Sequence, residues 1–350
     1  MTDAVAKLVE NLRLQAAGCA HLGSPFYAAL LELMAGDVEA HGPVWTVLGP
    51  HADEPLGAAY PIRLLGGVHR MVLAGDAPAL AAHFPTTGGD GDVAATWPEY
   101  RDLLAAQPDA VIDTLGRPPQ TNEVGRTASL AGGLAVVAQI TRLPLRLLEI
   151  GTSAALNLRL DRYWYTQDGS GWGDPSSSVR FADLWAPARP PFEAGAVIAT
   201  RRGCDRDPID AAEEGSALTL LSYVWPGQDA RFETLRDALE IAAGFPVDVD
   251  RSDARHWLPA QLEELPRGMA TVVMHSVFWQ YLPTETRDSI VATFTEASAR
   301  ATDDAPLAWL QLEPSERGNS LELRLKTWPG GEQVVLAKAG FHAGRVTWLD

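Results

Sequence analysis

Polar side chains follow several apolar runs at the point where each run ends. The first case is RLLEIGTSAALNL, residues 146–158, in which Glu149 leads into Gly151 and Ser153. The others are Asp205 in RRGCDRDPID, Asp253 in DRSDARHWL and His275 in VVMHSVFWQYLP. If the apolar runs are parallel strands, their carboxyl ends meet at one edge of a sheet, where open α/β sheets bind ligands. The sequence therefore predicts a polar site along that edge.

The turn at Gly151 has little side-chain bulk, because Thr, Ser and Ala residues follow the glycine. A ligand could approach its backbone, and a helix over residues 155–164 would offer free amide groups at its start. The alternative is a tight connection packed against a neighbouring strand, since an isolated glycine turn is a weak signal.

The carboxylates after the later strands each allow two roles. Asp205 could accept both hydroxyls of a ribose, and we expect it to be solvated without ligand, so that its replacement changes stability little. Asp207 and Asp210 lie nearby, and we expect Asp210 to cap the next helix. Asp253 could accept the exocyclic amine of an adenine, or it could cap the helix that follows.

Two further polar residues lie at the ends of later apolar strands. His275 ends the apolar strand of VVMHSV and could act as a base or orient a substrate, although a histidine at a strand end is often structural. Glu313, in LQLEPSERG, follows a later strand and is a further carboxylate near the same edge.

The stretch RPPQTNEVGR, residues 117–126, places polar groups before the first strand. Asn122 and Arg126 would share a helix face, and the helix end could present Asn122 and Glu123 to a substrate as catalytic groups. The alternative is a capping box in which Gln120 or Thr121 begins the helix.

The spacing of apolar residues predicts a helical N-terminal domain over residues 1–120, in which Ser24 caps a helix that begins with Pro25. Strands and helices alternate in residues 121–350, which predicts an α/β domain. We expect a doubly wound, Rossmann-like, mostly parallel sheet with an antiparallel last strand. The inserted residues 161–195 contain Gly, Ser, Pro and aromatic residues, and we interpret them as a β hairpin or a lid near the mouth of the sheet that carries Trp164 and Trp172.

Composition restricts the partners. The 350 residues carry a net charge of −17, which disfavours nucleic acid because an acidic surface repels phosphates. The two cysteines, Cys19 and Cys204, form no CxxC pair, so a metal site of the cysteine type is not expected. The N-terminus lacks the apolar core of a signal peptide, and no apolar run is long enough to span a membrane. We expect a cytoplasmic protein that acts on a small molecule or a protein, and the sequence leaves its oligomeric state open.

The order E-I-G-x-S, G-C-D-R-D-P, S-D-A and V-V-M-H-S-V-F-W-Q-Y-L-P resembles class I S-adenosylmethionine-dependent methyltransferases over residues 126–350. The resemblance implies a Rossmann-like sheet and a cofactor held by residues at the strand ends. It assigns the methionine part to Gly151 with Ser153, the ribose to Asp205 and the adenine to Asp253; Glu149 and His275 complete the cofactor-binding candidates. Ala155 departs from the pattern, because these enzymes usually have glycine there.

The whole chain is also similar to DUF2332, a family of uncharacterised bacterial proteins common in actinobacteria. The matching stretches are SPFYAALL, TNEVGRTASL, LLEIGTSAALNLRLDRYWY, RRGCDRDPID, YVWPGQDARFETLRDAL and HSVFWQYL. The expected activity is methyl transfer from S-adenosylmethionine, with His275, Asn122 and Glu123 as catalytic candidates. The alternatives are a non-catalytic Rossmann-like binding or scaffold protein and an NAD(P)-dependent oxidoreductase, against which the missing G-x-G-x-x-G motif argues.

Overall fold

The computed structural model describes residues 3–116, 119, 122–342 and 344–349. The chain packs as two compact units, one formed by residues 1–121 and 213–233, the other by residues 122–212 and 234–350. Gln120 and Thr121, which the capping-box hypothesis invoked, lie outside the described residues. No helix among the described residues is long and apolar enough to cross a membrane.

The first unit is built from helices. They are α1 (Asp3–His21), α2 (Pro25–Glu39), α3 (Pro43–Leu48), α4 (Tyr60–Ala74), α5 (Pro78–Ala81), α6 (Val93–Ala106), α7 (Pro108–Leu115) and α9 (Glu214–Ser222), with short 3-10 turns η1 (Gly49–His51), η2 (Leu56–Ala58) and η3 (Pro85–Thr87). Proline stands in the first turn of α2, α3, α4, α5 and α7. A proline there removes no helical hydrogen bond, because the first amides of a helix have no partner within it.

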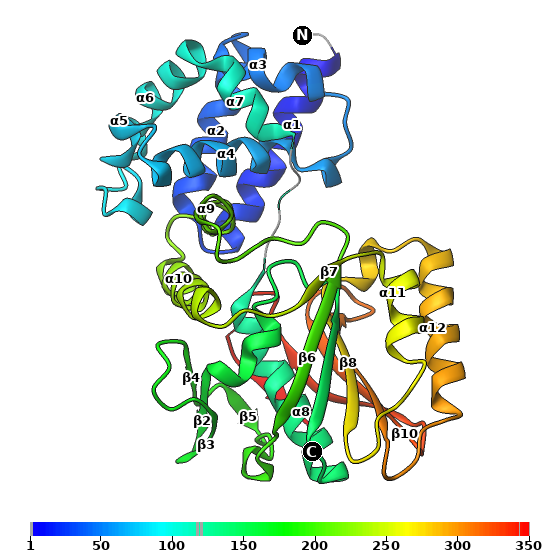
Figure 1. Cartoon of the computed structure of the whole chain (residues 1–350). Coiled ribbons are helices and arrows are strands. Elements are labelled where there is room, and N and C mark those ends of the chain that lie inside the picture. The colour runs from blue at the N-terminus through cyan, green and yellow to red at the C-terminus, as the bar shows by residue number, and fades with distance from the viewer. Residues whose placement is uncertain (1–2, 117–118, 120–121, 343, 350) are drawn as a thin grey trace. The chain divides into compact units, whose positions relative to one another are not determined.

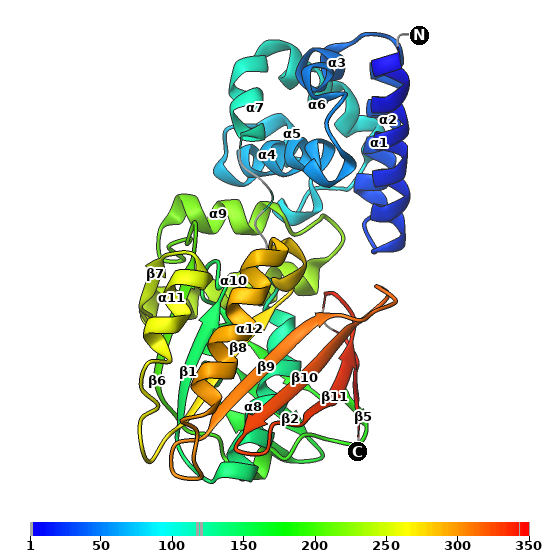
Figure 2. The same cartoon turned by 90° about the vertical axis from the view of Figure 1, so that its right-hand side faces the viewer.

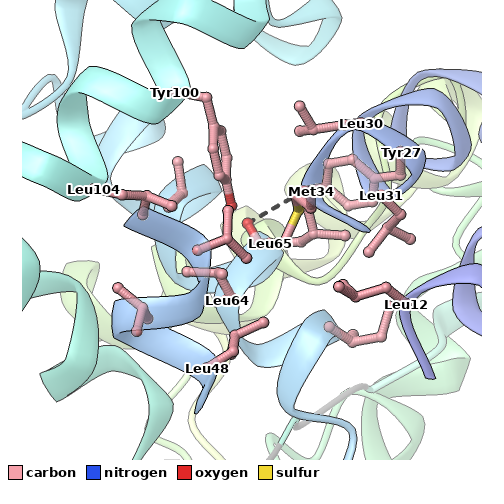
Figure 3. Packing of buried hydrophobic residues seen from close by; sticks show 14 of the residues in the cluster. Leu12, Tyr27, Leu30, Leu31, Met34, Leu48, Leu64, Leu65, Tyr100 and Leu104 are labelled. Carbon is pink, nitrogen blue, oxygen red and sulfur yellow. Dashed lines mark hydrogen bonds between the residues drawn. The ribbon is translucent and has the colours of Figure 1, made fainter. Parts of the chain in front are cut away.

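The core of this unit consists of large aliphatic and aromatic side chains that come together from α1, α2, α4 and α6 (Figure 3). Tyr27 lies within it and donates its hydroxyl to the carbonyl of Leu65, at 3.4 Å. Helix α2 begins at Pro25 as predicted, but Ser24 makes no side-chain cap. Its hydroxyl instead donates to the carbonyl of Pro226, at 2.6 Å, and so joins the start of α2 to the returning segment 213–233.

The second unit contains a nine-stranded sheet in the order β5-β12-β11-β10-β9-β8-β1-β6-β7 (Figures 1 and 2). The strands are β1 (Leu145–Ile150), β5 (Trp185–Pro187), β6 (Ile198–Asp205), β7 (Val249–Arg251), β8 (Ala270–Ser276), β9 (Leu307–Pro314), β10 (Leu321–Trp328), β11 (Gln333–Ala339) and β12 (Val346–Trp348). The five strands from β7 to β9 are parallel, whereas β9 to β12 pair antiparallel. The α/β class and the mostly parallel sheet are thus confirmed, and the antiparallel part is larger than the single strand predicted.

Helices cover both faces of the parallel strands. Helix α8 (Thr127–Thr141) packs on one face, where Gly133 lies against Leu310. Helices α11 (Ala254–Gln261) and α12 (Thr284–Ser298) pack on the other, in a cluster that includes Leu148, Ile150 and Val273. The remaining helix, α10 (Asp229–Gly244), contains the point at which the chain passes from the first unit to the second.

The inserted residues 161–195 are not a lid. Strands β2 (Trp164–Gln167) and β3 (Ser170–Gly173) form the predicted hairpin, β4 (Arg180–Ala182) pairs parallel to β2, and β5 lies beside β12 at the edge of the main sheet farthest from β7. Trp172 is buried and donates its indole N–H to the carbonyl of Ala196, at 2.9 Å. The lid interpretation was wrong because these aromatic side chains pack on one another around Tyr165 instead of lying over the strand ends.

Candidate functional site

The turn after β1 has an unusual backbone. Gly151, Ser153 and Ala155 have φ values of 71°, 52° and 57°, so three alternate residues are left-handed. Residues other than glycine rarely adopt this conformation, and such strain is more frequent at functional sites than elsewhere. The predicted helix over residues 155–164 is replaced by the short 3-10 helix η5 (Asn157–Arg162), because the left-handed Ala155 cannot belong to a right-handed helix.

Glu149 is buried at the carboxyl end of β1. Its two oxygens accept hydrogen bonds from the Thr152 hydroxyl, at 2.5 Å, and from the Asn157 amide, at 2.9 Å. Burial raises the pKa of Glu149 to about 7, an effect that the two hydrogen bonds oppose and the nearby charge of Asp205 reinforces. Sequence reasoning had proposed Glu149 but missed Thr152 and Asn157, whose role depends on the fold of the turn. The buried Arg159, which donates to the carbonyls of Ala154, Ala155 and Phe245, was also missed.

Asp205 connects the ends of β1 and β6. One carboxylate oxygen accepts the backbone N–H of Ser153, at 2.8 Å, and the other accepts that of Asp207, at 2.9 Å. The side chain is half-buried. The expectation that Asp205 is only solvated without ligand was wrong, because these amides of the turns need an acceptor and the carboxylate supplies one.

His275 and Glu313 form a buried pair at the ends of β8 and β9. Nδ1 of His275 lies 2.6 Å from Oε1 of Glu313, and the two residues are 0% and 3% exposed. The imidazole stacks on Trp279, with centroids 5.5 Å apart, and packs near Trp309. Nε2 of His275 and Oε2 of Glu313 have no hydrogen-bond partner among the described residues.

Residues 277–282, which we call the β8 segment, follow His275 and Ser276. Val277 has a φ of 51°, which is rare for a β-branched residue. The ring of Phe278 lies against Gly151, since a Cβ built on that glycine would come 2.1 Å from it. Gly151 is therefore required both for its backbone conformation and for this close approach.

The strand order places the predicted residues along one edge, with Asp253 after β7, Asp205 at the end of β6, the Gly151 turn after β1 and His275 near the end of β8. They do not share one face. Glu149 pairs with Met274, so Glu149 and His275 point to opposite faces of the sheet. His275 lies on the face covered by α11 and α12, whereas Glu149 lies on the face of α8.

Of the two aspartates considered as helix caps, Asp253 caps a helix and Asp210 does not. Asp253 caps α11 and accepts the N–H of Arg255, at 2.9 Å, so the structural alternative is observed. Asp210 does not cap the next helix. It accepts the N–H of Ala212, at 2.9 Å, while α9 is preceded by Glu213 at its N-cap, because the chain makes a local turn before that helix begins.

Asn122 and Glu123 both hold backbone. Asn122 is buried and its side-chain oxygen accepts the N–H of Leu156, at 3.0 Å, which ties it to the turn after β1. Glu123 accepts the N–H of Gly125, at 3.3 Å, and its other oxygen lies 3.6 Å from Nδ1 of His342. Asn122 is thus brought to the site.

A cavity of about 520 Å³ is lined by Arg142, Leu143, Pro144 and Val197 at the amino end of β1, and it contains none of the predicted residues. No group of three or more His, Cys, Asp or Glu side chains in the described part of the chain is arranged to hold a metal ion.

Fold and site together define an α/β protein whose polar residues gather at the carboxyl ends of parallel strands. The chain belongs to the DUF2332 family, described as "Uncharacterized protein conserved in bacteria", which matches residues 9–348. No curated protein matches the chain. The predicted family is confirmed, and the activity has to be inferred from the site.

Proposed function

We propose that the second unit is an S-adenosylmethionine-dependent methyltransferase that acts on a small molecule or a protein. The observation that carries the proposal is the position of Asp205 beside the Gly151 turn. The chain runs from β1 to β6 and β7 on one side, and then returns to β8 and β9 on the other. Open α/β sheets bind ligands where the strand order reverses in this way.

Asp205 has the acceptor capacity that a ribose requires. Each of its carboxylate oxygens accepts one backbone N–H, and a carboxylate has about four lone-pair positions in all. Each oxygen can therefore accept one hydroxyl of the ribose as well. Ser153 adds a side-chain hydroxyl without a partner among the described residues, in the same turn.

The residues proposed for the other parts of the cofactor fit less simply. Asp253 uses one oxygen to cap α11, so the adenine amine is assigned to the other oxygen. The ring of Phe278 occupies the space over Gly151, so the methionine part can approach that turn only when this ring has moved aside.

S-adenosylmethionine supplies a methyl group on a positively charged sulfur. Methyl transfer to a polar acceptor requires alignment, exclusion of water and removal of a proton from the acceptor. Nε2 of His275 is the candidate acceptor of that proton. Phe278 and Trp279 provide apolar surface that excludes water, and Asn122 with Glu149 holds the turn that contacts the cofactor.

The alternatives have less support. An NAD(P)-dependent oxidoreductase would need the backbone of the turn to approach a pyrophosphate at a helix N-terminus, but a 3-10 helix follows the turn. A non-catalytic binding or scaffold protein would bind no S-adenosylhomocysteine or would bind it without transferring a methyl group. Titration with S-adenosylhomocysteine separates the first of these cases from a methyltransferase.

The test is calorimetric titration of the whole chain with S-adenosylhomocysteine and with NAD. We expect binding of S-adenosylhomocysteine alone. Asp205→Asn retains one acceptor oxygen for the turns but loses the charge. Its affinity for S-adenosylhomocysteine should fall by about tenfold or more, because the loss of one charge-assisted hydrogen bond has an effect of that size.

Asp210→Asn is the matched control, because Asp210 is exposed and accepts only one local N–H. It should leave affinity unchanged. No heat and no change in melting temperature with millimolar S-adenosylhomocysteine would refute cofactor binding, and an unchanged affinity in Asp205→Asn would refute the ribose assignment.

A further inference from the structure

Glu313 gathers three hydrogen bonds at one carboxylate oxygen. Its Oε1 accepts the backbone N–H of Phe278, at 3.0 Å, and of Trp279, at 3.2 Å, and it lies 2.6 Å from Nδ1 of His275. The side chain comes from β9, whereas all three partners come from β8 or the β8 segment. Glu313 therefore connects the imidazole to the backbone that covers it.

These contacts define which nitrogen of His275 carries the hydrogen. An oxygen that accepts two backbone N–H groups presents lone pairs to its neighbours, so the third short contact requires Nδ1 to be the donor. In the neutral ring Nε2 is then an acceptor. This atom is buried and has no hydrogen-bond partner among the described residues, so it is the ring nitrogen whose acceptor capacity the fold leaves unused.

The same oxygen anchors a strained segment. Val277 is left-handed, Phe278 lies over Gly151, and Trp279 stacks on the imidazole at an interplanar angle of 17°. A left-handed β-branched residue persists only where other contacts hold it. The two amides bound to Glu313 are such contacts, and they immediately follow Val277.

We propose that Glu313 is a positioning residue for the reaction: it holds His275 in the Nδ1–H tautomer and fixes the backbone of Phe278 and Trp279 in the β8 segment. This role in a reaction rests on the function proposed above. Both consequences are properties of the protein without cofactor, so they are measured separately from cofactor binding. Because a single oxygen serves both, its loss releases the ring and the segment together.

The first measurement is the ¹⁵N spectrum of the histidine rings in the whole chain, with His275 assigned by its absence from His275→Gln. We expect a protonated Nδ1 and a bare Nε2. In Glu313→Ala the ring should change to the Nε2–H form, and the amides of Phe278 and Trp279 should exchange with solvent about tenfold faster or more, since each loses a hydrogen bond to a charged group.

The conservative variant separates positioning from packing. Glu313→Gln retains an oxygen that can accept the same bonds, so it should keep the Nδ1–H tautomer and speed exchange by only about threefold, because the bonds are no longer charge-assisted. Glu316→Gln, which removes an exposed carboxylate three residues away, should change neither reading.

An Nε2–H tautomer in the unaltered protein would overturn the proposal, as would amide exchange in Glu313→Gln equal to that in Glu316→Gln. Both readings remain decisive if Glu313→Ala does not fold. If S-adenosylhomocysteine fails to bind while the tautomer and the exchange rates are as expected, the proposed function is wrong and the positioning of His275 by Glu313 stands.

Discussion

Each unit buries one histidine completely, and the two rings differ in how their nitrogens are used. In the first unit, Nδ1 of His69 lies 2.9 Å from the carbonyl of Ser222 and Nε2 lies 2.7 Å from the Thr86 hydroxyl. In the second unit, His275 has a partner at Nδ1 only. A buried polar atom without a partner costs free energy. Both nitrogens of His69 thus serve the fold, whereas Nε2 of His275 makes no hydrogen bond within the described residues.

His69 also shows what the returning segment does. Ser222 ends α9, which the chain reaches only after the first strands of the second unit. The carbonyl of Ser222 can only accept, so Nδ1–H of His69 donates to it, and Nε2 accepts from Thr86. A neutral histidine thus satisfies both neighbours and ties residues 213–233 to α4.

The largest effect that sharpens the comparison is the pH dependence of the two units. Burial lowers the pKa of His69 to about 4 from its ordinary 6.5, so the first unit should lose stability as the pH falls through that range. Burial raises the pKa of Glu149 to about 7 from its ordinary 4.5. The contribution of Glu149 to the stability of the second unit is therefore full below about pH 4.5 and is lost as the pH rises through 7. Each change corresponds to about 3 kcal/mol of unfolding free energy, with opposite sign.

Hydrogen exchange can follow each unit separately, once it is corrected for the intrinsic effect of pH on exchange. Amides of α4 report on the first unit and those of β1 on the second. His69→Gln and Glu149→Gln should each abolish the pH dependence of its own unit only, and Glu149→Gln should stabilise the second unit near pH 8. If the stability of both units changed with pH in the same direction, the assignment of opposite effects to His69 and Glu149 would be wrong.

The next effect compares two left-handed glycines. Gly151 has a φ of 71° and meets Phe278, whereas Gly75, which ends α4, has a φ of 83° and open space around it. Alanine at Gly75 should cost about 1 kcal/mol for backbone strain alone. Alanine at Gly151 should cost about 3 kcal/mol, because the added methyl group must also displace the ring.

Phe278→Ala isolates that second part. In the Phe278→Ala background the cost of Gly151→Ala should fall to about that of Gly75→Ala. Urea unfolding of the three single variants and of the Gly151→Ala/Phe278→Ala double variant would measure this. If the difference between the two glycines survived the loss of Phe278, the close approach of the ring would not be its cause.

Much of the second unit could be predicted because its strands are marked by local apolar runs. The ends of those runs located Gly151, Asp205, Asp253 and His275, and parallel pairing was enough to bring them to one edge. The side-chain partners could not be predicted. The bond from Ser153 to Asp205 spans 52 positions, and that from His275 to Glu313 spans 38, so each depends on register between strands.

The conformation of the turns was a second limit. Nothing in the letters of GTSAALN indicates that Ser153 and Ala155 are left-handed, since neither residue type favours that conformation. The predicted helix therefore failed there. The return of residues 213–233 to the first unit was equally hidden, because α9 has the composition of any short helix and its destination depends on contacts such as that of Ser222 with His69.

The smallest effect concerns two aspartates that cap helices in different units. Asp92 caps α6 by accepting from Ala94 and Ala95, and Asp253 caps α11 by accepting from Arg255. Loss of either cap through alanine should cost about 1 kcal/mol of unfolding free energy in its own unit. Only Asp253 lies at the strand-end edge. Only its replacement should therefore also lower the affinity for S-adenosylhomocysteine, by about tenfold if its second oxygen accepts the adenine amine.

Serine separates the two roles of Asp253, because serine caps a helix nearly as well as aspartate but has a shorter side chain and only one oxygen. Asp253→Ser should therefore recover the stability that alanine loses and still bind the ligand weakly, whereas Asp92→Ser should recover stability with affinity unchanged throughout. Denaturation and calorimetric titration of the four variants would provide both readings. If Asp253→Ser restored stability and showed full affinity, Asp253 would be a cap like Asp92. The adenine would then have to be held by another residue, and the difference between the two units would narrow to Asp205, His275 and the turn between them.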